Sequence, residues 1–349
     1  MSLSKEIPFE HLLVSLLDEK KPLAPRNLYR FSDLGSADLK KLVSIWPKIP
    51  LWRRQALMGD LYQLSESDTV LSFSQVSRLA LQDEDPSVRL LAVRTLIDYE
   101  EDDLIDTFID MLEHDPDTDV RAASATALSP FVYLGELEEI SPKRMRAVEE
   151  CLLGVIAGND QVLVRRKAVE ALSFTSREEI EPIIDNAYHS KDTDWLVTAL
   201  FSMGRSANKR WNDQVLAKLD DKRPAVRAEA AGAAGELEIN EAVPRLLEML
   251  DEDDEDIRAA AIWSLSQIGG EGVRESLEDM LDEIENDDEA ELIENALENL
   301  TLTEDFLALS IMELPDETPE NLDKDIYFYP EDSELEEEET EDEDEDDED

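Results

Sequence analysis

The feature of this sequence that most constrains its fold is a short apolar–arginine pattern that returns at nearly regular intervals. Val226-Arg227-Ala228-Glu229-Ala230 recurs 31 residues later as Ile257-Arg258-Ala259-Ala260-Ala261. With the arginine taken as an anchor, equivalent positions lie at residues 53, 89, 121, 165, 196, 227, 258 and 293, at intervals of 36, 32, 44, 31, 31, 31 and 35 residues. Self-similarity with a period of roughly 20 to 50 residues indicates a chain built from stacked structural repeats.

Each copy contains the pattern of two short helices joined by an acidic turn. Apolar residues recur at helical spacing before the turn, as at Leu246, Leu247 and Leu250. The aspartates of turns such as Asp251–Asp256 stand where they can cap the second helix and complement its dipole. A small residue three positions after the anchor, such as Ala168, permits close approach of neighbouring helices. Two antiparallel helices per repeat, repeated about eight times, predict an all-α protein with the fold of an α-solenoid.

The spacing and composition also predict how the chain is divided. The interval of 44 residues between the anchors at 121 and 165 predicts an insertion around Val132 to Pro142. We expect residues 1–36 to form a helical N-terminal capping segment and residues 37–302 to form the repeats. Prolines at 315, 319 and 330 interrupt the stretch after the repeats, so 303–330 is predicted to be a linker or docking segment. Residues 331–349 hold 16 acids in 19 positions and are predicted to be a disordered polyacidic tail.

The chain is strongly acidic, but its charge is unevenly spread. It has 33 Lys and Arg against 87 Asp and Glu, which gives a formal net charge of −54. Residues 1–60 carry about +3, whereas residues 61–330 carry about −41. Nucleic-acid affinity rests largely on neutralising phosphates with Lys and Arg, so this balance argues against direct binding of nucleic acid. Such an acidic field attracts basic proteins instead.

The repeats resemble those of a known family. Asp85–Leu96 fits the motif Asp-x-x-x-Val-Arg-x-x-Ala-x-x-x-Leu with one residue fewer in the turn. This motif is similar to that of the HEAT-repeat family, and within it to the short repeats called PBS-lyase HEAT-like, over roughly residues 37–302. The resemblance implies a right-handed α-solenoid of about eight two-helix repeats, an armadillo-like superhelix in which the second helices line the concave face.

The resemblance also implies a structural role for the anchor arginines. In this family, Asp and Arg around the turn form a ladder that stacks one repeat on the next. Leu196 and Ile293 stand where two arginines would be expected, so the ladder is predicted to be interrupted there. The arginines predicted to form the ladder are Arg89, Arg121, Arg165, Arg227 and Arg258.

Some enzymes share this type of repeat, but the sequence lacks the residues they need. Deoxyhypusine hydroxylase resembles the architecture and binds two iron ions through several His-Glu pairs. Here there is no His-Glu dipeptide, and the three histidines, His11, His114 and His189, are far apart in the chain. Alkylpurine glycosylases need a cationic groove, and no catalytic signature of phycobilin lyases is present. Cys151 follows acidic residues in an apolar helix and is predicted to be buried. We expect no enzyme activity, no metal and no cofactor.

Two further features bear on location. No apolar stretch approaches the roughly 18 residues that span a bilayer, and the first 17 residues lack the apolar core of a signal peptide. The single cysteine cannot form an internal disulfide. We therefore expect a cytoplasmic protein with no membrane partner.

A stripe of candidate binding residues follows from the helical spacing of the second helices. Positions two, five and nine residues after the anchors share one exposed face. Aromatic rings among carboxylates suit a basic peptide, because the rings contact Arg or Lys stems and the acids take the charge. Packing of Phe201 and Trp263 between repeats is the open alternative. The predicted stripe residues are Glu170, Phe174, Phe201, Arg205, Glu229, Glu236, Trp263, Gln267 and Glu298.

The sequence therefore favours a noncatalytic scaffold or adaptor that presents an acidic concave surface to a basic protein or peptide. The alternative is an acidic nucleic-acid mimic or chaperone that shields basic nucleic-acid-binding proteins. A third interpretation has the acidic tail fold back on residues 1–60 and occlude the groove. An enzyme related to phycobilin lyases is the least favoured interpretation.

Overall fold

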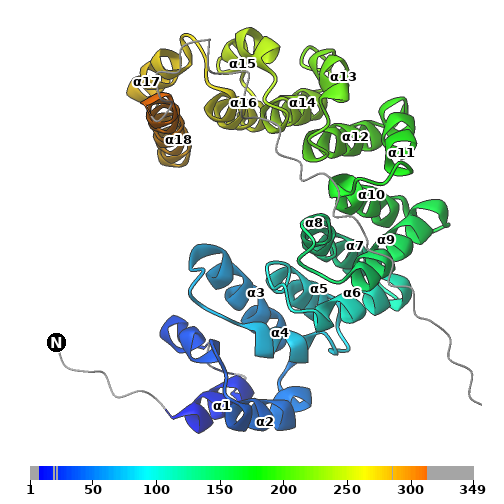
Figure 1. Ribbon diagram of the computed structural model, residues 1–349. Helices are drawn as coiled ribbons and strands as arrows, with labels where there is room; N and C mark the ends of the chain where they lie inside the picture. The colour runs from blue at the N-terminus through cyan, green and yellow to red at the C-terminus, as the bar shows by residue number, and fades with distance from the viewer. Residues whose placement is uncertain (1–7, 19, 21–22, 285, 313–349) are drawn as a thin grey trace, which may run out of the picture. The chain divides into compact units, whose positions relative to one another are not determined.

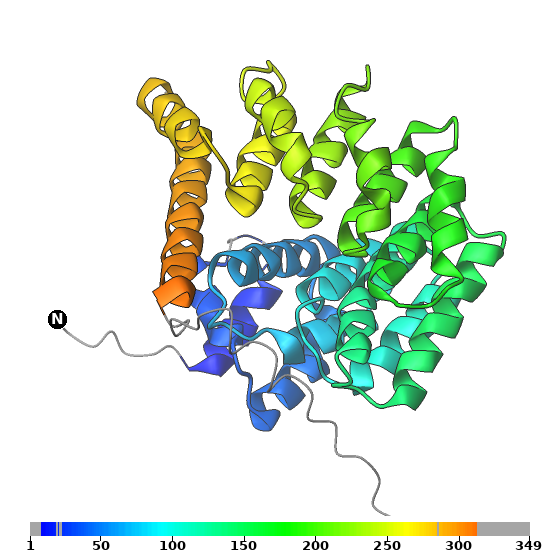
Figure 2. The same cartoon turned by 45° about the horizontal axis from the view of Figure 1, so that its top comes forward.

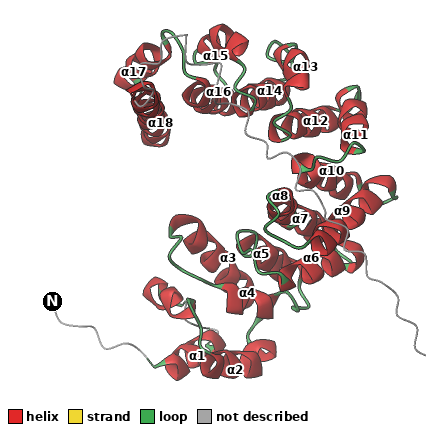
Figure 3. Ribbon diagram, in the orientation of Figure 1, coloured by secondary structure: helices red, strands yellow, loops and turns green. Residues whose placement is uncertain are grey.

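Eighteen α-helices and no strand make up the part of the chain that the computed structural model describes (Figures 1 and 3). That part comprises residues 8–18, 20, 23–284 and 286–312, without the side chains of 303–312. Its portion within residues 1–300 forms one compact unit.

Most of the helices are arranged in pairs, and every predicted anchor lies in the second helix of a pair. These second helices are α3 (Leu51–Ser67), α5 (Pro86–Thr95), α7 (Thr118–Ala127), α10 (Val162–Ala171), α12 (Thr193–Arg205), α14 (Pro224–Glu236), α16 (Glu255–Ile268) and α18 (Asp287–Met312). The first helices are α2 (Ser36–Ile45), α4 (Ser74–Ala80), α6 (Asp103–His114), α9 (Pro142–Ala157), α11 (Ile180–Tyr188), α13 (Asn212–Leu216), α15 (Val243–Met249) and α17 (Val273–Glu283).

The second helices form one layer of the structure. From α3 to α16, each second helix contacts the next second helix along the chain (Figures 1 and 2). From the pair α4–α5 to the pair α15–α16, each second helix also contacts the first helix of its own pair. Each repeat thus packs against its neighbours in the sequence, which confirms the predicted α-solenoid of about eight two-helix repeats.

In several repeats the acidic turn caps the second helix and the small residue after the anchor is buried, as the sequence pattern predicts. Asp85 begins α5 by accepting hydrogen bonds from the backbone N–H groups of Ser87 and Val88, and Asp254 caps α16 in the same way. Such caps satisfy N–H groups that have no partner within the helix. Of the eight residues three positions after the anchors, seven, among them Ala168, are buried, whereas Ala56 is exposed. Aspartate caps begin α5, α7, α12 and α16, whereas α3, α10 and α14 begin without a side-chain cap.

The long interval between two anchors contains an extra helix. α8 (Ser129–Glu136) lies at the predicted insertion and contacts α7, α9 and α10. The Glu136 carboxylate at its end accepts hydrogen bonds from the Thr175 hydroxyl at 3.1 Å and the Ser176 backbone N–H at 2.9 Å. The insertion therefore fastens the connection that leads from α10 to α11.

The predicted boundaries fit the described residues unevenly. α1 (Phe9–Leu17) and the 3₁₀ helix Pro25–Phe31 lie within the predicted N-terminal capping segment. The boundary predicted at residue 302 lies close to the end of the first compact unit at Leu300, but it falls inside α18, so residues 303–312 are helical. The first helix breaker after the last anchor is Pro315, and nothing earlier in that stretch disfavours a helix. Residues 313–330 and the predicted tail lie outside the described residues.

Candidate functional site

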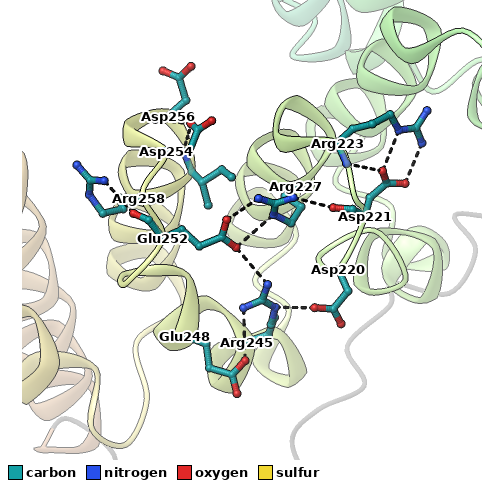
Figure 4. Close-up of polar contacts among 11 residues, drawn as sticks. Asp220, Asp221, Arg223, Arg227, Arg245, Glu248, Glu252, Asp254, Asp256 and Arg258 are labelled. Carbon is teal, nitrogen blue, oxygen red and sulfur yellow. Dashed lines mark hydrogen bonds and ion pairs between the residues drawn. The ribbon is translucent and has the colours of Figure 1, made fainter.

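Four of the five predicted ladder arginines make the same set of bonds. The Nε and Nη2 groups of Arg89 donate to the Asp115 carboxylate at 2.7 and 2.8 Å, and its Nη1 donates to the Asp83 carbonyl at 2.9 Å. Figure 4 shows the bonds of Arg227 and the bond from Arg258 to the Glu252 carbonyl. Arg121 pairs with Asp160 and the Asp115 carbonyl, Arg227 with Glu252 and the Asp221 carbonyl, and Arg258 with Glu289 and the Glu252 carbonyl.

These bonds cross-link successive repeats. The carbonyl belongs to the turn just before the arginine's own helix. The carboxylate belongs to the corresponding turn of the next repeat or, in the case of Glu289, to the first turn of α18. The Arg89 and Asp115 side chains are only 11% and 6% exposed. The bond from Arg121 likewise holds the pKa of the Asp160 carboxyl below its ordinary value. These four arginines therefore serve to join successive repeats.

The ladder is interrupted on both sides of the α11–α12 repeat. The turn after α11 has Ser190 at the position where the other turns have an acid, so Arg165 of α10 has no carboxylate to pair with there. Instead, its Nε donates to the Ile156 carbonyl at 3.0 Å, and its guanidinium lies 5.8 Å from the centre of the Trp195 ring. At the next anchor stands Leu196, as the sequence indicated.

Other contacts replace the missing cross-links. The Asp221 carboxylate accepts hydrogen bonds from Nε and Nη2 of Arg223 in its own turn, both at 2.8 Å. These bonds lower the pKa of Asp221 (Figure 4). α10 and α12 are joined instead by an Arg166–Asp194 ion pair at 3.2 Å, in which the Asp194 side chain is 67% exposed. The α11–α12 repeat is thus held by more exposed contacts than the ladder provides elsewhere.

The predicted stripe residues gather where this repeat meets its neighbours. Phe201 of α12, Glu229 of α14 and Trp263 of α16 line one open cavity of about 410 Å³. Phe201 and Glu229 also line a second cavity of about 320 Å³, which includes Glu170 of α10. We call the two together the Glu229 pocket. Its other residues used below are Arg205, Glu236 and Lys167.

The two aromatic residues are placed differently. Phe201 is partly buried and lines both cavities of the pocket. Trp263 is 37% exposed and lies on Gly235, where a Cβ would come within 2.7 Å of its ring. The close approach of α14 and α16 at this glycine therefore positions the indole beside the pocket.

Two of the predicted acids already have cationic partners. The Glu170 carboxylate accepts from Lys167 at 2.6 Å and from the Thr198 hydroxyl at 2.8 Å. Glu236 forms an ion pair with Arg205 at 3.3 Å. The stripe is therefore less negative than a count of its carboxylates indicates.

Glu229 is the exception among these acids. It makes no hydrogen bond or ion pair with any residue that the structure describes, and it is partly buried. Burial, reinforced by the charges of Glu170 and Glu236, raises its pKa to about 7, while Lys167 and Arg205 act in the opposite direction. A buried carboxyl without a donor lowers its free energy by binding a cation or a proton.

Not every predicted residue belongs to the pocket. Gln267 and Glu298 are exposed and line neither of its two cavities. Lys167 does belong to it but was missed, although it stands two residues after its anchor, as Glu229 does. Thr198 stands at the same position after Leu196, but it is buried and is linked to the pocket by its hydrogen bond to Glu170. The spacing itself could have found Lys167.

The described residues contain no group of three His, Cys, Asp or Glu side chains able to hold a metal ion. His114 and His189 are exposed, each beside an aspartate of its own helix. Cys151 is buried, and this burial raises the pKa of its thiol to about 12. Within 8–18, 20, 23–284 and 286–312, no helix has the length and apolar character needed to cross a membrane.

Comparison with known proteins identifies the type of repeat. A family model described as HEAT repeats matches residues 74–152, 180–266 and 212–298. No curated protein matches the sequence. Among solved structures, Escherichia coli YibA is 17% identical, with a TM-score of 0.42 over 81% of this chain and 99% of that one. The CpcE–CpcF complex of phycocyanin lyase from Nostoc is 18% identical, with a TM-score of 0.44 over 65% and 94%. Importin beta is 14% identical, with a TM-score of 0.42 over 84% and 46%. Because the HEAT model matches more than half of the 349 residues, the chain belongs to the HEAT-repeat family.

Proposed function

We propose that this protein is a noncatalytic scaffold that binds a basic segment of a partner protein at the Glu229 pocket. The observation that carries the proposal is the Glu229 carboxyl, which has no donor among the residues that the structure describes and lies in a cavity that Phe201 and Trp263 also line. Aromatic faces and a desolvated carboxylate are the groups that recognise an arginine or lysine side chain. The family's long array of repeats supplies the surface on which such a segment can lie.

The charge of the whole chain supports the same partner. Residues 61–330 carry about −41, so a basic protein is attracted and steered before it makes any specific contact. Long-range attraction by itself gives little selectivity, because exposed charges are screened within roughly 10 Å at ordinary salt. Selectivity therefore requires a local feature, which we assign to the Glu229 pocket.

Binding of a fluorescent nona-arginine peptide to the full chain at low salt tests the proposal. Phe201→Ala and Trp263→Ala are each expected to weaken binding about tenfold, because each removes an aromatic anchor worth about 1.4 kcal/mol. Trp52→Ala is the matched control, since Trp52 lies on α3 and is 47% exposed.

Two further results bear on the alternatives. Equal affinity for all these variants, together with loss of binding when residues 331–349 are removed, would favour the nucleic-acid mimic. Binding unchanged at 0.5 M salt would contradict steering by exposed charges.

A further inference from the structure

Arg205 is held in a different way from the ladder arginines. Its Nη1 is 3.3 Å from the Glu236 carboxylate, its side chain is 40% exposed, and its guanidinium makes no hydrogen bond with any described residue. Arg89, by contrast, is 11% exposed and donates to a carboxylate and two carbonyls. An exposed ion pair of this kind contributes little to stability. Arg205 can therefore leave its place without unfolding the repeat.

The place that Arg205 occupies has the chemistry expected of a partner's binding site. Its guanidinium carbon lies 5.7 Å from the centre of the Phe174 ring and 5.5 Å from that of Phe201. Both distances lie close to the outer limit of about 6 Å for a cation–π contact. Two aromatic rings and the Glu236 carboxylate thus surround a cation that belongs to the protein itself.

We infer that Arg205 is a built-in competitor, which in the free protein fills the subsite of Phe174, Phe201 and Glu236 that takes an arginine side chain of the partner. This inference rests on the function proposed above. A partner arginine displaces Arg205, while a second cation of the same segment pairs with Glu229 in the adjoining part of the pocket.

Arginine fits the subsite better than lysine. The present occupant is a guanidinium near two rings and one carboxylate. A guanidinium is more weakly hydrated than an ammonium group and is better suited to aromatic faces. The segment that replaces it is therefore expected to be rich in arginine.

The test compares Arg205→Ala with Arg94→Ala in the full chain, with labelled nona-arginine as the probe. Arg94 lies on α5, is exposed and has no ion pair with a described residue. Each variant removes one positive charge, so the gain from general electrostatics is the same in both. Arg205→Ala is expected to bind nona-arginine about fivefold to tenfold more tightly than Arg94→Ala, because its subsite is empty.

Replacing arginine by lysine, either at position 205 or in the peptide, makes the test more specific. Arg205→Lys should bind with intermediate affinity, and nona-lysine should gain less than nona-arginine from Arg205→Ala. Thermal unfolding of each variant establishes that it is folded before its affinity is compared.

Equal affinities of Arg205→Ala and Arg94→Ala, or weaker binding by Arg205→Ala, would overturn the inference. If Trp263→Ala still weakens binding in that case, the proposed scaffold function stands and only the competitor role of Arg205 falls. If neither Trp263→Ala nor Phe201→Ala changes binding, the pocket is not the binding site and both proposals fall together.

Discussion

The α11–α12 repeat differs from the repeats on either side of it in how its charged residues are used. Elsewhere an anchor arginine such as Arg89 is buried in bonds to the turn of the next repeat. Around α12 there is no such bond on either side, and two cations of this region, Arg205 and Lys167, lie at the Glu229 pocket. The difference shows that the contacts between repeats and the Glu229 pocket use the same types of residue. Cations and aromatic rings face the pocket where they are not needed to join repeats.

Removing a ladder arginine tests the difference between the two regions most directly. Arg89→Ala leaves the Asp115 carboxylate buried and unpaired, so we expect the free energy of unfolding to fall by about 3–5 kcal/mol. Arg165→Ala, in the interrupted region, should cost only about 1 kcal/mol, because it loses one bond to a carbonyl and a long ring contact. Urea denaturation measures both, and equal losses would contradict the distinction between the two regions.

A second prediction concerns the pH dependence that Glu229 confers. Its pKa is raised from 4.5 to about 7 in the folded protein, so its contribution to stability is present below pH 4.5 and is lost as the pH rises through about 7. Glu229→Gln should remove that loss. The variant is expected to be about 3 kcal/mol more stable than the wild type at pH 8 and similar to it at pH 4. Chemical denaturation at several pH values checks this, and parallel curves would show that Glu229 titrates normally.

A third prediction uses two glycines of the same helix. A Cβ at Gly235 would lie 2.6–2.8 Å from atoms of Ser264 and Trp263, whereas a Cβ at Gly232 meets nothing within 4 Å. Gly235→Ala should therefore destabilise the protein by about 1–3 kcal/mol and displace the indole of Trp263. Gly232→Ala should stabilise it by up to about 1 kcal/mol, since alanine favours the helix. Thermal unfolding measures both, and the same sign of change in the two variants would contradict the packing described for α14.

The smallest predicted effect is a repair of the ladder. The Ser190 hydroxyl accepts the backbone N–H of Asp192, as the acids Asp83 and Asp115 do for the second residue after them. Ser190→Asp keeps that bond and supplies a carboxylate for Arg165. We expect a gain of up to about 1 kcal/mol in the free energy of unfolding. Ser190→Ala is the control without a carboxylate, and a gain that persists in Arg165→Ala would show that the new acid acts elsewhere.

The fold can be predicted from the sequence because its signal is local and repeated. The anchors fall in all eight second helices, and after seven of them the residue three positions later is buried. The predicted end of the repeats, at residue 302, lies ten residues before the end of α18. No residue between 303 and 312 marks that boundary, and the prediction rests on the prolines beyond it.

The candidate site could be predicted only in part. Helical spacing places Phe201, Glu229 and Trp263 on one face, but it does not say which charged side chain pairs with which. The pairing of Arg205 with Glu236 and the lack of any described partner for Glu229 depend on how three separate helices approach one another. At the first repeat the spacing places the anchor at residue 53, but it is the neighbouring Arg54 that pairs with the buried Asp83, at 3.2 Å.

The interruption of the ladder also has a mechanical consequence. In a chain whose repeats contact mainly their neighbours, stability is close to a sum of repeat and interface contributions, so a load applied along the chain acts on each interface in turn. The interfaces on both sides of α11–α12 lack the buried arginine bond. A protein stretched between two partners would therefore yield first at this repeat. The Glu229 pocket, which α10, α12, α14 and α16 build together, would then open under tension, and a segment bound there as we propose would be released.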